Sequence, residues 1–126
     1  MERLTCIAID DDPLFLRTMK VYLEQIEWID LQNTYINPVH GAKGILQLKP
    51  ALILTDQEMP LVDGNYLIDW IRPHIDKMKK RPFVILISAV DQPPQSLMDN
   101  IDGFVRKSSV LSADTLAEQL KRIISR

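Results

Sequence analysis

Polar side chains that could serve metal-dependent phosphoryl transfer follow four short apolar runs of this chain. In chain order they are Asp10 and Asp11, Asp56, Ser88, and Lys107. Two adjacent carboxylates close to a third are costly unless a cation neutralises them. Mg²⁺ is the natural choice, because it is a hard ion that prefers oxygen ligands and commonly keeps waters and phosphate oxygens in its shell. The residue types therefore predict a magnesium site with phosphate chemistry.

Each of these residues can be given a chemical role. Asp56 stands alone after its apolar run, and an aspartate carboxylate can act as a nucleophile that forms an acyl phosphate. The phosphoryl group in transit needs positive charge and hydrogen bonds on its oxygens. Lys107 and the metal could supply the charge, and Ser88 could donate a hydrogen bond.

The apolar runs are of strand length and alternate with segments of helical spacing, which predicts repeated βα units around a parallel sheet. The run at 31–36 is interrupted by polar residues and predicts an edge strand. In an open parallel sheet, ligands bind outside the carboxyl ends of the strands. The fold should therefore bring the polar residues above into one pocket. The expected strands cover residues 6–9, 31–36, 51–55, 83–87 and 103–106.

Five helices are expected between and after these strands. Asp12 can cap the first, with Pro13 in its first turn. Gly41 and Gly44 should weaken the second. The fourth has room for only about one and a half turns, and Ser112 or Asp114 can cap the last. The first helix is expected from residue 13 to between 25 and 27, and the second over 38–48. The third is expected over 65–78, where Pro73 should kink the helix or end it early. The fourth is expected over 95–100, and the last begins after residue 112 or 114.

Composition excludes several classes of function. The chain has 126 residues and a net charge of -2, which suits one domain without an electrostatic footprint for nucleic acid. The basic cluster at 77–81 is interpreted as a solvated helix end rather than a phosphate-binding patch. Cys6 is expected in the core of a protein from a reducing compartment. With no signal peptide and no membrane-spanning run, we expect a soluble cytoplasmic protein with no membrane contact.

Five motifs are spread over essentially the whole chain: Ile9-Asp10-Asp11-Asp12-Pro13, Leu54-Thr55-Asp56-Gln57-Glu58-Met59-Pro60, Asp63-Gly64, Ile87-Ser88-Ala89 and Gly103-Phe104-Val105-Arg106-Lys107. Together they resemble the receiver domain of two-component response regulators. We therefore expect residues 1–126 to form one receiver domain, with no output domain in this stretch. The opening residues 6–13 look most like regulators with a LytTR-type DNA-binding output domain.

The resemblance implies a doubly wound α/β fold of the flavodoxin-like type, with strand order 2-1-3-4-5. It also implies the site residues. Asp56 would accept the phosphoryl group, Ser88 and Lys107 would contact it, and Phe104 would be the aromatic switch. The implied Mg²⁺ ligands are Asp11, Asp56 and the backbone carbonyl of Glu58, with Asp10 acting mostly through water.

The implied partners are a histidine kinase or histidine phosphotransfer protein as donor, and an output domain or downstream protein as recipient. This domain would not contact nucleic acid directly. A homodimer through the fourth or fifth structural unit is a further hypothesis. Like other receivers, the chain would not be an enzyme beyond assisting its own phosphorylation and dephosphorylation.

Three features depart from the family pattern. Ser108 follows Lys107 where the family usually has a proline after a cis bond, so we expect a trans bond and a slight displacement of Lys107. The stretch from Ser88 to Gly103 is shorter than usual by about one helical turn, which alters the usual output surface at the fourth helix. Phe104 lacks the hydroxyl of the commoner tyrosine, so a switch would depend on ring packing.

Two other classes of function remain open from the sequence. A pseudo-receiver that binds partners without phosphorylation would fit the short fourth helix and the Lys107-Ser108 pair. A phosphohydrolase with an aspartate nucleophile usually carries a second Asp two residues later, where this chain has Glu58. His40 and His74 lack metal-ligand company and are expected at the surface. The four glycines form no phosphate-cradling loop.

Overall fold

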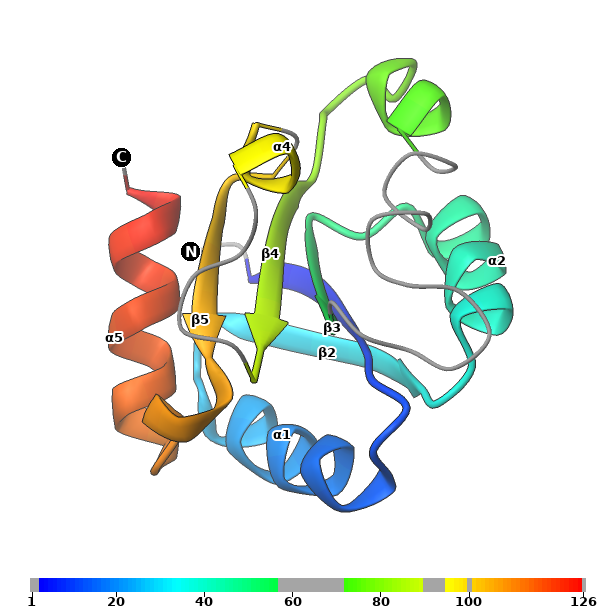
Figure 1. The fold of residues 1–126 in the computed structure, drawn as a ribbon. Helices are drawn as coiled ribbons and strands as arrows, with labels where there is room; N and C mark the ends of the chain where they lie inside the picture. Colours follow the sequence, from blue (N-terminus) through cyan, green and yellow to red (C-terminus); the bar gives the residue numbers. More distant parts are fainter. Residues whose placement is uncertain (1–2, 57–71, 90–94, 100, 126) are drawn as a thin grey trace.

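The computed structural model describes residues 3–56, 72–89, 95–99 and 101–125. Five parallel strands form one sheet in the order β2-β1-β3-β4-β5 (Figure 1). This arrangement confirms the expected doubly wound α/β fold and the expected strand order. The strands are β1 Leu4–Ile9, β2 Ile29–Tyr35, β3 Leu52–Asp56, β4 Phe83–Ser88 and β5 Gly103–Arg106.

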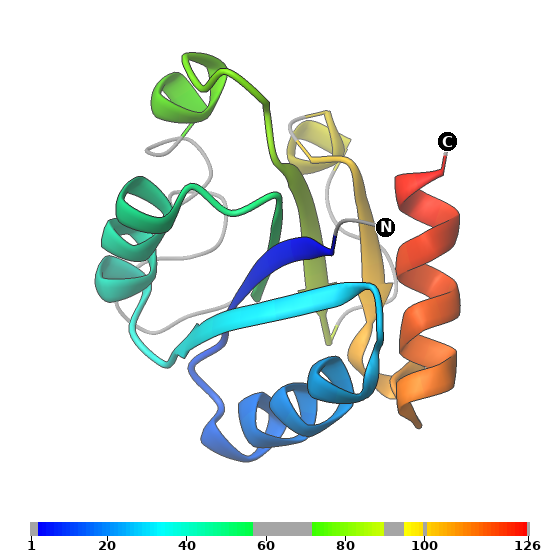
Figure 2. The ribbon, with the colours of Figure 1, turned by 180° about the vertical axis from the view of Figure 1, so that it is seen from behind.

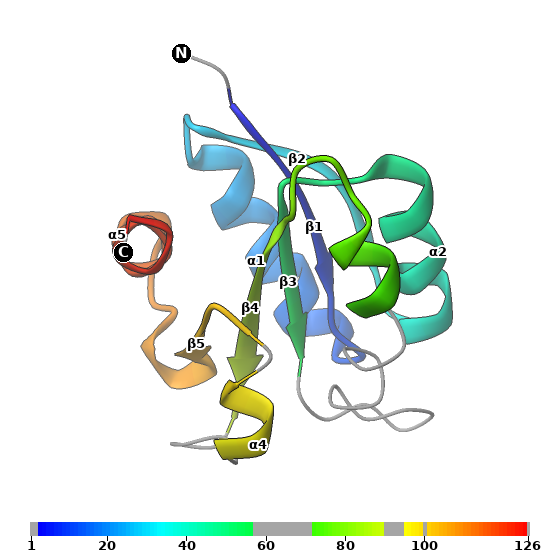
Figure 3. The same cartoon turned by 90° about the horizontal axis from the view of Figure 1, so that it is seen from above.

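Helices cover both faces of this sheet. Viewed from above, α1 and α5 lie on one side and α2 lies on the other (Figure 3). The view from behind shows β2 at the edge of the sheet, with α1 beside it (Figure 2). In the described residues, no helix has the length and apolar character needed to cross a membrane. The helices are α1 Pro13–Gln25, α2 Pro38–Leu48, α4 Gln95–Met98 and α5 Ala113–Ile124, with a 3-10 turn at Lys107–Ser109.

The caps of the helices follow from short polar side chains. The Asp12 side chain accepts hydrogen bonds from the backbone N–H groups of Leu14 and Phe15, and Pro13 opens α1. Such caps satisfy donors that the helix itself leaves unpaired. Of the two candidates for α5, Ser112 is the cap, and it exchanges hydrogen bonds with Thr115 in a capping box. The first turn of α1 is therefore fixed directly beside Asp10 and Asp11.

Two glycines in α2 serve close packing on the sheet. A Cβ at Gly41 would overlap the side chain of Ile9, and one at Gly44 would overlap the ring of Tyr35. The helix nevertheless spans the full expected range, Pro38–Leu48. The glycines lower helix propensity, but they let α2 approach β1 and β2 closely, and the resulting packing offsets that cost.

Buried apolar side chains fill both faces of the sheet. The face under α1 and α5 includes Leu16, Leu54 and Leu116. The face under α2 includes Ile7, Ile45 and Ile53, and Ile75 of a helical stretch at 72–76 joins it. These two cores hold the central strands from both sides, as in other doubly wound sheets.

Cys6 is a fully buried member of the core on the α1 and α5 side. Burial raises the pKa of its thiol well above the ordinary range, since the thiolate would lose its hydration. This fits the expectation of a structural core residue.

Some boundaries differ from the expected ones. β2 begins at Ile29, two residues before the expected start, and ends at Tyr35, one residue before the expected end. The early start follows because buried Ile29 pairs with Leu4 of β1. Most of the expected third helix lies outside the described residues. Its described part is helical over 72–76. As expected, α4 is short, with four residues, and the four basic residues of the 77–81 cluster are exposed.

Candidate functional site

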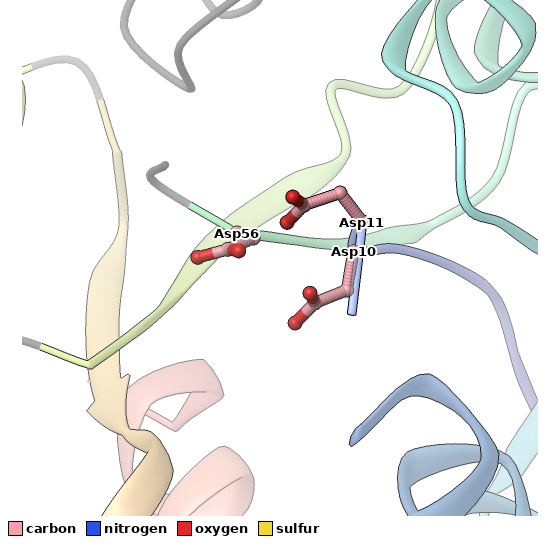
Figure 4. A group of neighbouring side chains, drawn as sticks. All are labelled: Asp10, Asp11 and Asp56. Carbon is pink, nitrogen blue, oxygen red and sulfur yellow. The ribbon is translucent and has the colours of Figure 1, made fainter. Parts of the chain in front are cut away.

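Three carboxylates meet at the carboxyl edge of the sheet. Asp10 and Asp11 follow β1 directly, and Asp56 is the last residue of β3. Since β1 and β3 are parallel neighbours with Ile9 opposite Thr55, their ends lie side by side. Carboxylate oxygens of Asp10, Asp11 and Asp56 lie within 4.8 Å of one another. Figure 4 shows the three side chains extending to the same side of the strands.

Two of these three carboxylates are almost fully buried. Asp10 is 3% exposed and Asp56 is 4% exposed, whereas Asp11 is partly exposed. The backbone N–H of Asp12 donates to Asp10 Oδ1 at 2.9 Å, and the N–H of Asp10 donates to Tyr35 O at 3.0 Å. These bonds fix the orientation of Asp10. Charged groups this buried are costly without a partner.

Lys107 supplies positive charge to the two buried carboxylates. Its Nζ lies 2.9 Å from Asp10 Oδ2 and 3.3 Å from Asp56 Oδ2, and its side chain is 18% exposed. Asp10 Oδ2 accepts no well-aligned hydrogen bond from the described residues, so its attraction to Lys107 is chiefly that of charge at short range. Burial alone lowers the pKa of Lys107, but Asp10 and Asp56 outweigh it, and the net effect raises the pKa. Lys107 is therefore a stable cation at neutral pH.

The donor set fits a hard divalent cation. Three carboxylates and one ammonium leave a formal excess of two negative charges among these four groups. Oxygen ligands in a compact group, with Asp11 open to water, are what Mg²⁺ prefers. The residues expected to hold a metal, Asp10, Asp11 and Asp56, are thus brought together by the fold.

Ser88 and Phe104 come from β4 and β5, the two strands that follow β3 on the side of the sheet away from β1. Ser88 ends β4 and is 1% exposed. It lies one residue beyond Ile87, the register partner of Asp56, so it stands at the same edge of the sheet. Phe104 lies opposite Leu86 in β5, half-buried against the core on the α2 side. Both positions agree with the expected placement, and their proposed roles stay predictions.

Part of the expected site lies outside the described residues. Glu58, whose backbone carbonyl is an expected metal ligand, belongs to this part, as do Met59-Pro60 and Asp63-Gly64. The two histidines are exposed, as expected. Hollows of about 350 Å³ beside β2 and about 310 Å³ at the amino ends of β1 and β3 are lined by neither the carboxylates nor Lys107. Geometry and charge, rather than cavity size, therefore identify the site.

Sequence reasoning missed the contacts that hold Lys107. The ring of Phe15, in the first turn of α1, lies 4.7 Å from Lys107 Nζ. Gln119 of α5 holds the turn after Lys107, because its side chain bonds both the hydroxyl and the carbonyl oxygen of Ser109. The Lys107–Ser108 bond is trans, as expected, and Lys107 still reaches both carboxylates. An aromatic residue in the first turn after Asp12 was the available signal for the ring contact.

The doubly wound sheet with an acidic group at its carboxyl edge defines a class of α/β domain, and similarity to known proteins identifies the family. The family model for the response regulator receiver domain matches residues 6–121. The chain belongs to this family and is a receiver domain of two-component signalling. Its sub-family assignment to the LytTR type stays a prediction.

Individual relatives place the chain within this family. An uncharacterised response regulatory protein of Vibrio vulnificus is 31% identical over 121 residues, which cover 95% of this chain and 47% of that protein. The transcriptional regulatory protein BtsR of Escherichia coli is 24% identical over 68% of this chain and 34% of its own length. The chain therefore spans about half the length, or less, of these curated relatives.

Solved structures support the fold. The signal receiver domain of NarL from Mycobacterium tuberculosis superposes with a TM-score of 0.83 at 22% identity, covering 100% of both chains. RcsB of Salmonella typhimurium gives a TM-score of 0.83 at 24% identity, covering 99% of this chain and 61% of that one. At these identities the likeness concerns the fold alone.

Proposed function

We propose that this receiver domain accepts a phosphoryl group on Asp56 from a histidine kinase or a histidine phosphotransfer protein. The observation that carries the proposal is the reach of Lys107 to both Asp10 and Asp56 beside a third carboxylate. A buried ion pair alone would need one carboxylate. The additional carboxylates at the strand ends suit a site that binds a cation together with a phosphoryl group.

The transfer is a simple displacement at phosphorus. A carboxylate oxygen of Asp56 forms the new O–P bond while the P–N bond of the donor breaks. The bonding pair stays on the donor nitrogen, which leaves as neutral imidazole when the phosphoimidazole ring carries a proton on its other nitrogen. Little else is needed from the protein beyond positioning and charge.

Side chains around Asp56 supply that positioning. Lys107 stands 3.3 Å from Asp56 Oδ2, close enough to pair with an oxygen of the incoming group. Ser88, at the neighbouring strand end, would donate a hydrogen bond to another. Because Asp10 and Asp56 are nearly buried, these charged contacts are stronger than they would be in water.

The residues proposed to hold Mg²⁺ are Asp10, Asp11, Asp56 and the backbone carbonyl of Glu58. When bound, the metal supplies positive charge to the phosphoryl oxygens and to the crowded carboxylates. This proposal follows from the excess of negative charge described above.

Signalling would follow from the added charge. A phosphoryl group on Asp56 would draw Ser88 and Lys107 toward it and bias the packing of Phe104. The recipient would be an output domain or a downstream protein in the cytoplasm, with no direct contact between this domain and nucleic acid or membrane. The chain would act as a switch and not as an enzyme for other substrates, and a homodimer remains a hypothesis.

The experiment is intact-mass spectrometry after incubation with phosphoramidate, with and without Mg²⁺. We expect a gain of one phosphoryl group that requires Mg²⁺ and is absent in Asp56→Asn. A phosphorylated Asp56→Asn protein, or equal phosphorylation in a chelator, would contradict the proposal.

The second candidate function is a pseudo-receiver that binds partners without phosphorylation. The short α4, with four residues, favours it. The gathered carboxylates and Lys107 argue against it. No mass gain under any condition, together with no effect of Mg²⁺ on stability, would support this reading.

A further inference from the structure

Phe15 is the described contact of Lys107 that does not take part in the chemistry. It lies in the first turn of α1, is half-buried and packs against the core on the α1 and α5 side. Its ring centroid is 4.7 Å from Lys107 Nζ. A cation at this distance from an aromatic ring is attracted by the negative face of the ring.

The described contacts of the ammonium come from three separate elements. Asp10 follows β1, Asp56 ends β3 and Phe15 lies in the first turn of α1. Two of these partners change during the proposed reaction. Asp56 loses its charge as it forms the acyl phosphate, and Asp10 would share its negative charge with a bound cation. The ring of Phe15 keeps the same shape and charge distribution throughout.

We propose that Phe15 is a positioning residue for phosphoryl transfer, because it holds the Lys107 ammonium at the site while that ammonium exchanges Asp10 for an oxygen of the phosphoryl group. This inference rests on the proposed function and adds to it. The attraction to a ring face tolerates small shifts of the cation, whereas a hydrogen bond requires alignment. The ring also excludes water from the ammonium, which is 18% exposed as a side chain.

The backbone around Phe15 makes the side chain separable from the helix cap. The N–H of Phe15 donates to Asp12 Oδ1 at 3.3 Å, and a side-chain substitution leaves that donor in place. The neighbouring Leu14 is 73% exposed. Leu14→Ala is therefore a matched control in the same turn, and neither Phe15 nor Leu14 is among the proposed metal ligands or phosphate contacts.

The first measurement is the rate of phosphorylation by phosphoramidate at saturating Mg²⁺. Phe15→Leu keeps an apolar side chain but removes the ring, and we expect it to react about five- to tenfold more slowly. Phe15→Tyr keeps the ring face and should stay within about twofold of wild type, as should Leu14→Ala. Because loss of packing alone would give the same order of rates, a second measurement reports on the ammonium itself.

The second measurement is the NMR signal of Lys107 in protein labelled with ¹³C at the lysine ε-carbon, assigned by its loss in Lys107→Met. A ring face beside the ammonium displaces this signal from the common lysine position. We expect the displacement in wild type and Phe15→Tyr, and its loss in Phe15→Leu. The urea denaturation midpoint of each variant shows whether it is folded.

The outcomes separate the inference from the function on which it rests. A phosphorylated wild type with an equally fast Phe15→Leu variant would overturn the role of Phe15 alone. An unchanged Lys107 signal in Phe15→Leu would do the same. A wild type that gains no phosphoryl group would overturn the proposed function, and the role of Phe15 in it would fall as well.

Discussion

The two strands that flank β1 are built in opposite ways. β3, Leu52–Asp56, is buried at every residue and pairs on both sides. β2, Ile29–Tyr35, is buried at Ile29, partly or fully exposed elsewhere, and forms the edge of the sheet. Its register with β1 shifts between Cys6 and Ile7, which leaves Gln32 as an extra residue.

The two strands differ in what their surroundings do: the position of β3 is fixed on both sides, whereas β2 shields the edge of the sheet. Neighbours on both sides fix the end of β3, and Asp56 stands there within reach of Lys107. A bulge and polar side chains on β2 discourage other chains from pairing with the exposed edge, and the site needs no charge from that strand. The candidate site therefore lies where the sheet is most constrained.

The largest contrast should appear in the core. Leu54→Ala should lower the free energy of unfolding by about 3–5 kcal/mol, because the fully buried side chain leaves a cavity. Leu54 is 1% exposed. Urea denaturation measures the change. The matched control is Leu31→Ala in β2, which packs partly buried against the same core and should cost about 1 kcal/mol. Equal losses would mean that the two strands are equally constrained.

Removing the Lys107 ammonium tests how much it stabilises the buried carboxylates at the ends of the central strands. Lys107→Met should lower the free energy of unfolding at neutral pH by about 2 kcal/mol, less than for a fully buried pair because Lys107 is partly exposed. Its raised pKa means that the folded state binds the proton more tightly. The contribution is therefore fully present below the ordinary lysine value of 10.5 and is lost as pH rises through the raised pKa.

The measurement for this prediction is urea denaturation of both proteins across a pH series. The gap between wild type and Lys107→Met should be constant near neutral pH and should narrow above the ordinary lysine value. A gap that widens with rising pH would contradict the assigned sign.

A smaller effect of opposite direction is expected at Asp11. Without divalent cations, Asp11→Asn should raise the free energy of unfolding by about 1 kcal/mol, because it removes repulsion among three close carboxylates. Wild type should gain about 1.4 kcal/mol when Mg²⁺ is tenfold above its dissociation constant. The variant should lose most of that gain. Thermal unfolding with Mg²⁺ and with a chelator measures both; an unaltered response to Mg²⁺ would exclude Asp11 as a ligand.

The smallest effect is expected at the bulge of β2. Gln32→Ala should change the free energy of unfolding by less than about 0.5 kcal/mol, since the exposed side chain lies away from the core. Denaturation beside Leu54→Ala provides the comparison. A loss as large as that of a core residue would show that the edge strand is held by this side chain.

Much of the fold could be predicted from the sequence because its signals are local. The run at 51–55 has strand length and apolar character, and Asp12 with Pro13 marks the start of α1. The positions of Asp10, Asp11, Asp56 and Lys107 follow from the rule that parallel strands share one carboxyl edge. Proximity at that edge is thus readable without coordinates.

The remaining features depend on contacts between distant residues. The tolerance of α2 for Gly41 comes from Ile9, thirty-two positions earlier in the numbering. The meeting of Phe15 with Lys107 depends on how α1 docks on the sheet. A half-buried aromatic residue predicts packing against something, but its partner is set by tertiary structure. Likewise, the hydrogen bonds of Gln119 with Ser109 join two segments whose spacing carries no local signal.

The position of Cys6 gives the molecule an internal reporter of its own opening. The thiol is inaccessible in the core under α1 and α5, and its raised pKa keeps it protonated. A thiol reagent can therefore reach it only when this core opens. Where opening and closing are fast relative to labelling, the rate of modification measures the free energy of that opening. In the wild-type chain, the rate of Cys6 modification with and without a ligand at the strand ends therefore measures how much that ligand stabilises the closed core, with no engineered label.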